Sequence, residues 1–304
     1  MANKNSEQLR DFVNLISVNG TLATLEIKEG TTESGVPYIG LSGSIQFGET
    51  GVETLKFRSF AMAQKSDGTD SKAYQNLVKW VSTAIPMTKD KENATKALFR
   101  GSFASNDFYT EQEGGSVVES IVFNVNGIFD YDVNFSTQYS TNAIVDFEGY
   151  VKSIADEMKN DEATGRKRMT LVGLDYRKEA IIVKNVIVDT NIAEEFVDFM
   201  PVGSTAKFSL GYYVHKGEAK KATGGLGKQR VTEGRDYLEL IVEGCSDPYE
   251  DDKSVITPKI LKELMNVREA KLAQIKENGE QGTVSAPKKK ATVASPISDE
   301  DIPF

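Results

Sequence analysis

The sequence predicts a mainly β protein in which two five-stranded units follow one another along the chain. Apolar and polar residues alternate over many short segments, a pattern typical of half-buried strands. Three such segments, one helical segment and two further strand segments form an order that occurs twice. The 304 residues, 39% of them hydrophobic, suffice for two domains with cores of their own and argue against global disorder.

The first unit, in residues 1–140, begins with a three-strand meander over 21–28, 36–47 and 52–61. A helix is predicted over 71–85, because apolar side chains recur there at helical spacing and Pro86 ends the pattern. We place its last two strands at 97–104 and 117–129.

The second unit, in residues 141–248, repeats this order. Its expected elements are strands over 142–154, 166–176 and 179–189, a helix over 191–200, and strands over 204–216 and 235–244. The final strands end alike, in Val125-Asn126-Gly127 and Val242-Glu243-Gly244. A helix between the third and fourth of five short strands is the order of the oligonucleotide-binding (OB) barrel. We therefore predict two tandem OB-like five-stranded barrels, each with a helix between strands 3 and 4.

Beyond Pro248 the composition changes, and a linker with an amphipathic helix is expected over 249–278. Thr257 is a suitable cap for that helix, and Pro258 suits its first position. Residues 279–304 contain few large apolar side chains, so we expect a C-terminal helix followed by a flexible tail.

The chain ends in an acidic run closed by an aromatic residue: Asp299, Glu300, Asp301, Ile302, Pro303 and Phe304. This tip resembles the C-terminal peptide of bacterial and phage single-stranded DNA-binding proteins, which recruits replication and repair enzymes. Phe304 suits a pocket, Pro303 limits the conformations to be ordered, and the terminal carboxylate suits a basic partner. The alternative is an ordinary solubilising tail.

The resemblance implies a non-enzymatic protein that coats single-stranded DNA with little sequence preference during replication, recombination or repair. The tip would bind partner proteins of those processes. Bacterial members of this group usually carry one barrel per chain, so a chain with two suggests a phage or mobile-element version in a host bacterial cytoplasm. A homo-oligomer is left open.

A net charge of −9 means that DNA binding must depend on local cations and on stacking, because all three parts of the chain are acidic. OB barrels bind single strands across their second and third strands, and residues 216–235 form a glycine-containing basic loop. The candidate DNA-binding residues are Tyr38, Lys56, Arg58, Phe60, Arg166, Lys167, Arg168, Lys207, Tyr213, Lys216, Lys220, Lys221, Lys228, Arg230, Arg235 and Tyr237. The alternatives are an ordinary solvated sheet face and a solubilising loop.

Other chemistry has little support in the sequence. With Cys245 and His215 as the single cysteine and histidine, neither a disulfide nor a zinc site within the chain is expected. We expect no metal, no cofactor and no catalysis, and a cytosolic protein without a membrane segment. Two rival functions remain: a β-domain interaction or structural protein that does not bind DNA, and a nuclease or recombinase with an OB-like accessory region.

Overall fold

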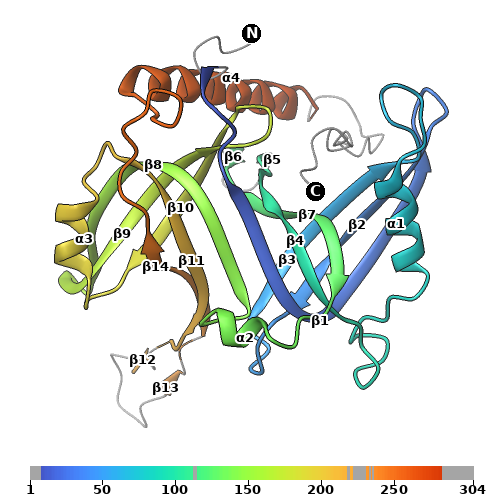
Figure 1. Ribbon diagram of the computed structural model, residues 1–304, viewed down its shortest axis with the longest axis horizontal. Helices are drawn as coiled ribbons and strands as arrows, with labels where there is room; N and C mark the ends of the chain where they lie inside the picture. Colours follow the sequence, from blue (N-terminus) through green and yellow to red (C-terminus); the bar gives the residue numbers. More distant parts are fainter. Residues whose placement is uncertain are drawn as a thin grey trace.

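The computed structural model describes residues 8–111, 115–217, 220–221, 231–232, 234 and 236–282. Ten strands form one sheet that rolls into two closed barrels, seen side by side in Figure 1. Mainly β architecture with two tandem OB-like barrels and a C-terminal helix is therefore confirmed. The C-terminal helix continues to Gly282, past the predicted start of the tail at residue 279, and residues 283–304 lie outside the described residues.

Barrel 1 closes in the strand order of an OB barrel. Its strands, in order around the ring, are β1 (Asn14–Thr31), β2 (Pro37–Gln46), β3 (Thr54–Met62), β7 (Ile121–Asp130) and β4 (Lys96–Ser105). The pairing of β3 with β7 is parallel, through Phe57 and Phe123, and β4 returns to β1 to close the ring. Helix α1 (Lys72–Val81) lies between β3 and β4 in the chain.

Barrel 2 repeats this arrangement. Its strands, in ring order, are β8 (Ala143–Lys159), β9 (Glu162–Leu174), β10 (Ala180–Val188), β14 (Tyr237–Cys245) and β11 (Thr205–His215). The parallel pair is again formed by the third and fifth strands, here through Val186 and Leu240. Helix α3 (Ala193–Phe199) occupies the place that α1 has in barrel 1.

Some short elements were not expected from the sequence. The segment predicted as one strand over 117–129 is divided into β6 (Ser116–Val118), which pairs with β5 (Phe108–Thr110), and β7. Ser120 causes the division, because its hydroxyl and carbonyl both bond the backbone of Asn106 and so close a hairpin. The other additions are α2 (Phe135–Gln138), β12 (Lys220–Lys221) and β13 (Val231–Thr232).

The two barrels share one hydrophobic core. Phe57, Phe99, Phe147 and Phe208 are its largest fully buried side chains, two from each barrel. Trp80 of α1 packs edge-on against Phe99, with ring centroids 6.1 Å apart, and so helps to close the end of barrel 1.

A direct ladder joins the barrels. The first residues of β1 and β8 pair antiparallel over five positions, with Ile16 opposite Val145 at the centre, and both of these side chains are fully buried. The joint is therefore main-chain hydrogen bonding within a common sheet, a firmer link than side-chain packing alone.

Helix α4 (Pro258–Gly282) lies across the top of barrel 2 in Figure 1 and extends toward β5 and β6 of barrel 1. Thr257 caps it as predicted, accepting a hydrogen bond from the amide of Ile260 at 3.3 Å. On barrel 2 its buried Leu264 belongs to a cluster with Val172, Leu174 and Ile182. Those strand residues alternate with the interior ones, so α4 covers the outer face of β9 and β10 at the end where the two strands join.

From Arg268 onward, α4 holds the β5–β6 hairpin of barrel 1. Buried Arg268 bonds Asp107 at 3.0 Å, Glu119 at 3.1 Å and Ser105 at 3.2 Å. A side chain at Gly279 would lie 2.2 Å from the ring of Tyr109, so that ring packs directly on the helix backbone. The helix is thus a strap from barrel 2 to barrel 1.

Candidate nucleic-acid interface

Four residues singled out from the sequence share one outer face of barrel 1. Lys56, Arg58 and Phe60 alternate outward on β3, and Tyr38 lies on the same face of the neighbouring β2. We call this outer surface of β1, β2 and β3 the β1–β3 face. In an OB barrel it is the surface that lies across the second and third strands.

Tyr38 and Phe60 form a stacked pair with ring centroids 5.4 Å apart and planes at 28°. Glycines give the rings room: Gly40 lies opposite Phe60 across the ladder, and Gly30 lies opposite Tyr38. A Cβ at Gly40 would be 3.7 Å from the Phe60 ring, and one at Gly30 would be 2.5 Å from the Tyr38 hydroxyl. The rings therefore lie against the backbone as a platform, each partly exposed.

Cations flank this platform. Lys56 and Arg58 are exposed. They lie opposite Ser44 and Ser42 of β2, and these short side chains do not cover the two cations. Arg58 donates to the side-chain oxygen of Asn106, which orients its guanidinium toward the start of the β5–β6 hairpin.

One cation of this face was not among the residues predicted from the sequence. Exposed Lys28 on β1 pairs with Gly40 and so stands in one row with Phe60. Across the row from Arg58 lies Glu26, which accepts a hydrogen bond from Ser42 at 3.3 Å. Three cations against this one carboxylate make the face locally positive on an acidic chain. The alternation of β1 indicates that Lys28 faces outward, but OB barrels bind strands mainly across their second and third strands, so the prediction did not extend to β1.

The corresponding face of barrel 2 is less open to a ligand, because a helix packs on part of it. α4 covers one end of the outer surface of its second and third strands, at Val172 and Leu174 of β9 and Ile182 of β10. Two barrels of the same fold therefore differ at the surface that most often binds ligands.

The three basic residues near the start of β9, Arg166 to Arg168, form ion pairs with carboxylates of the protein. Arg166 bonds Glu239 at 2.6 Å, Arg168 bonds Glu157 at 2.7 Å, and Lys167 bonds Asp156 at 2.6 Å. Burial alone would lower the pKa of Arg166, but the hydrogen bond and charge of Glu239 outweigh it, so the net shift is upward. Carboxylates of the protein thus compensate all three cations, Arg166 at a largely buried position and Lys167 and Arg168 at more exposed ones.

The other predicted residues of β11 and β14 also have partners. Lys207 lies 3.3 Å from Asp146, and the Tyr213 hydroxyl donates to Glu243. Burial and the neighbouring Glu243 carboxylate raise the pKa of Tyr213. Tyr237 is 45% exposed and packs at an angle on His215, with ring centroids 5.1 Å apart.

These residues lead into the basic loop. Lys216 is exposed after β11, and the backbone of Lys220 and Lys221 pairs with Val231 and Thr232. Lys228, Arg230 and Arg235 lie outside the described residues, as does the tip, Asp299 to Phe304.

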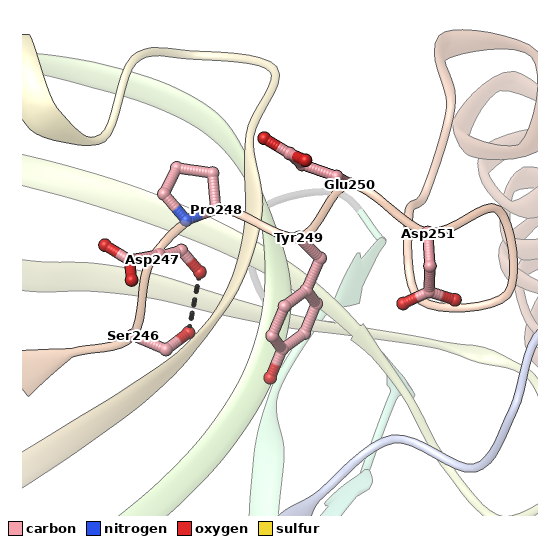
Figure 2. Close-up of a pocket in the computed structure, with 6 residues that line it drawn as sticks. All are labelled: Ser246, Asp247, Pro248, Tyr249, Glu250 and Asp251. Carbon is pink, nitrogen blue, oxygen red and sulfur yellow. Dashed lines mark hydrogen bonds between the residues drawn. The ribbon is translucent and has the colours of Figure 1, made fainter.

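An acidic pocket of about 740 Å³ lies where the chain leaves barrel 2 for α4. Figure 2 shows its lining, a continuous segment from Ser246 to Asp251 in which the Ser246 hydroxyl donates to the carbonyl of Asp247 at 2.9 Å. The lining includes Asp247, Glu250 and Asp251 and no cation. A phosphate backbone would be repelled there, so the pocket is not the nucleic-acid interface.

Two other kinds of site are absent from the described ranges. No group of three or more His, Cys, Asp or Glu side chains in this part of the chain is arranged to hold a metal ion. None of the helices described is both long and apolar enough to cross a membrane.

Comparisons with known proteins give a structural likeness and a family. No curated protein matches this sequence. Wild-type single-stranded DNA-binding protein from Thermus aquaticus is similar with a TM-score of 0.44 at 12% identity, over 80% of this chain and 96% of that one. A deletion mutant of the same protein gives 0.41 at 13% identity, over 82% and 98%. The family model described as YorF matches residues 13–278, which span both barrels and nearly all of α4, and the chain therefore belongs to the YorF family.

Proposed function

We propose that this protein binds single-stranded DNA with little sequence preference, without catalysis, through the β1–β3 face of barrel 1. The observation that carries the proposal is the stacked pair of Tyr38 and Phe60, held flat over glycines and flanked by cations. Bases of any identity have a π-face and can stack on such rings, whereas paired bases in a duplex are not free to do so.

The sparse charge fits this mode of binding. Lys28, Lys56 and Arg58 border the platform, close enough to meet phosphates on either side of a stacked base. Because the whole chain carries −9, a long ionic contact is unfavourable and stacking has to supply much of the free energy of binding.

Barrel 2 contributes in a different way, since α4 covers one end of the outer face of β9 and β10. The loop over 216–235 supplies the electrostatic grip there, through Lys216, Lys220, Lys221, Lys228, Arg230 and Arg235. Tyr237 at the loop's base adds an exposed ring. Tyr213 and the run from Arg166 to Arg168 support the base of the loop through their hydrogen bonds and ion pairs. Lys207 lies at the opposite end of β11, where it pairs with Asp146.

Recruitment of partner proteins is the second half of the proposal. The tip, Asp299 to Phe304, follows the last residue of α4, Gly282, by a stretch long enough to reach well beyond the barrels. Held near DNA by the barrels, it raises the local concentration of replication, recombination or repair enzymes that bind its terminal phenylalanine and carboxylate.

The alternative function that specific observations favour is a protein-interaction module that binds no DNA. Coverage of part of one barrel face by α4 and the net charge of −9 both favour it.

The test is a titration of labelled oligothymidylate and of a duplex of equal length at low salt. We expect clear preference for the single strand, and a loss of about tenfold or more when Tyr38 and Phe60 are both changed to alanine, from about 1–3 kcal/mol per stacked base. Phe199→Ala is the control for loss of a surface ring, because Phe199 is an exposed ring on α3, away from the β1–β3 face. Equal affinity for both DNAs, or none, would favour the alternative function.

A further inference from the structure

Barrel 1 carries a second set of paired cations and aromatic rings, on β4 and at the end of β7. The Arg100 guanidinium lies 5.5 Å from the centroid of the Phe129 ring, and the Lys96 ammonium lies 5.9 Å from that of Tyr131. We call these four residues the β4–β7 patch. Phe129 is 52% exposed and Tyr131 is 38% exposed.

A bulge in β7 turns these rings outward. Before it, Phe123 and Val125 point into the core, at 3% and 1% exposure. The register then skips Asn126, because Gly101 pairs with Val125 while Arg100 pairs with Gly127. One extra residue reverses the alternation, so the odd-numbered positions from Gly127 onward face solvent.

The ring of Phe129 is held in place by its neighbours. A Cβ at Gly127 would lie 2.7 Å from the ring, so the ring lies over this glycine as Phe60 lies over Gly40 on the other face. Leu98, between the two cations of β4, is buried beneath Phe135. The two cation–aromatic pairs are thus neighbours on a firm base rather than ends of mobile loops.

Among the described residues of barrel 2, the patch has no counterpart. An equivalent bulge occurs at Glu243, where Ser209 pairs with Gly244 and Leu210 with Val242. After it the chain continues into Ser246 and the acidic pocket of Figure 2. The same backbone device therefore presents rings and cations in one barrel and carboxylates in the other.

The patch adjoins the β1–β3 face, because β3 of that face pairs directly with β7 of the patch. Arg58 of β3 pairs with Asn124 of the neighbouring β7, and β7 in turn pairs with β4. Adjacent strands are roughly 5 Å apart, so a chain leaving Phe60 meets Phe129 within a few nucleotides. Within the described part of the molecule, neither Lys96 nor Arg100 has a carboxylate partner within 4.0 Å, so both charges remain available to an anion.

We propose that the β4–β7 patch is a second contact surface for single-stranded DNA, reached by the strand after it leaves the β1–β3 face. Bases stack on Phe129 and Tyr131, and Arg100 and Lys96 meet the flanking phosphates. The inference rests on the proposed function and adds a path around barrel 1.

The test compares two oligothymidylates, one of about 8 nucleotides, within the site size of one OB barrel, and one of about 30. In the variant Phe129→Leu/Tyr131→Leu an apolar group still covers Gly127 but no ring remains. We expect it to bind the long strand at least about tenfold more weakly, and the short strand within about twofold of the parent. Val133→Ala, at a side chain 76% exposed just beyond the patch, is the control for surface changes there.

A second variant tests the charges. Lys96→Gln/Arg100→Gln should reduce the slope of log affinity against log salt by about 1.4 on the long strand, at about 0.7 per phosphate contact. Lys72→Gln/Lys79→Gln, on α1, removes equal charge and should leave the slope unchanged. Equal effects of the two charge variants would overturn the patch as a specific contact.

The outcomes separate the two proposals. If the parent protein binds neither strand, the proposed function fails and the inference fails with it. If Tyr38→Ala/Phe60→Ala weakens binding while Phe129→Leu/Tyr131→Leu leaves the long strand unaffected, the inference alone is overturned. An equal loss on both strands would mean that the rings act through the β1–β3 face, which also overturns it. Thermal unfolding midpoints equal to that of the parent confirm that each variant is folded.

Discussion

Arg10 donates two hydrogen bonds of 2.8 Å to the two carboxylate oxygens of Glu148, joining the segment before β1 to the first strand of barrel 2. The same carboxylate accepts from the Tyr249 hydroxyl at 2.5 Å and from the Val13 amide at 2.6 Å. Burial alone would raise the pKa of Glu148, but these hydrogen bonds outweigh it, and the pKa lies below its usual 4.5.

Stability should therefore fall in acid. A carboxyl whose pKa is depressed in the folded state stabilises the fold above its unfolded value of 4.5, and the contribution is lost as pH falls through the folded value. Urea unfolding at a series of pH values between about 6 and 3 should show this decline. Glu148→Gln should lower stability at pH 6 and give a shallower pH dependence, and an unchanged slope would contradict the assignment.

The strap formed by α4 should depend on Arg268. Replacing it with methionine leaves Asp107, whose side chain is 8% exposed, without its cation, and breaking a buried pair in this way costs about 3 kcal/mol or more. Lys276→Met is the control, because the pair of Lys276 with Glu280 is exposed and contributes less than about 1 kcal/mol. Denaturant unfolding of both variants measures the difference, and similar losses would show that Arg268 does not hold the strap.

The basic loop should set the salt dependence of DNA binding. Changing Lys220, Lys221, Lys228 and Arg230 together to alanine removes four cations, and the salt slope for single-stranded DNA falls by about 0.7 for each phosphate that is no longer neutralised. Lys259 and Lys262 of α4, changed to alanine, provide a control outside the loop. A slope that stays the same in the loop variant would leave the loop with a role in solubility only.

The tip should affect partners but not DNA. Deleting Phe304 removes the aromatic anchor and moves the terminal carboxylate to Pro303, at a cost to partner binding of about 2 kcal/mol or more if Phe304 is a hot spot. Pull-downs of host replication proteins with the full-length chain and the deletion, beside DNA titrations of both, check the separation. Capture of the same partners by both chains would contradict recruitment through the tip.

The order of elements could be predicted because each strand shows its own alternation of apolar and polar residues. Ile39, Leu41, Ile45 and Phe47 alternate on and after β2 and are all buried, as expected from period two. The similar ends of the final strands, noted at Val125-Asn126-Gly127 and Val242-Glu243-Gly244, coincide with the two bulges. Local pattern thus carried more information about the repeat than overall sequence similarity did.

What could not be predicted depends on contacts between distant segments. The apolar stripe of α4 indicates that the helix is covered, but nothing in its spacing says that β9 and β10 cover it. Likewise, Arg166 reads as a free cation until the fold places Glu239 beside it, 73 residues away. The outward turn of Phe129 needs the register of β4 against β7, which a single strand's alternation cannot reveal.

The antiparallel ladder between β1 and β8 joins the two barrels of this chain as two subunits are joined in a symmetric dimer. Ile16 and Val145 meet where the first strands of the two barrels run antiparallel, so each barrel offers the other the same edge, as protomers do in a symmetric dimer. Here one polypeptide supplies both halves. Dilution cannot separate them, their stoichiometry is fixed during synthesis, and the pairing needs no encounter between molecules.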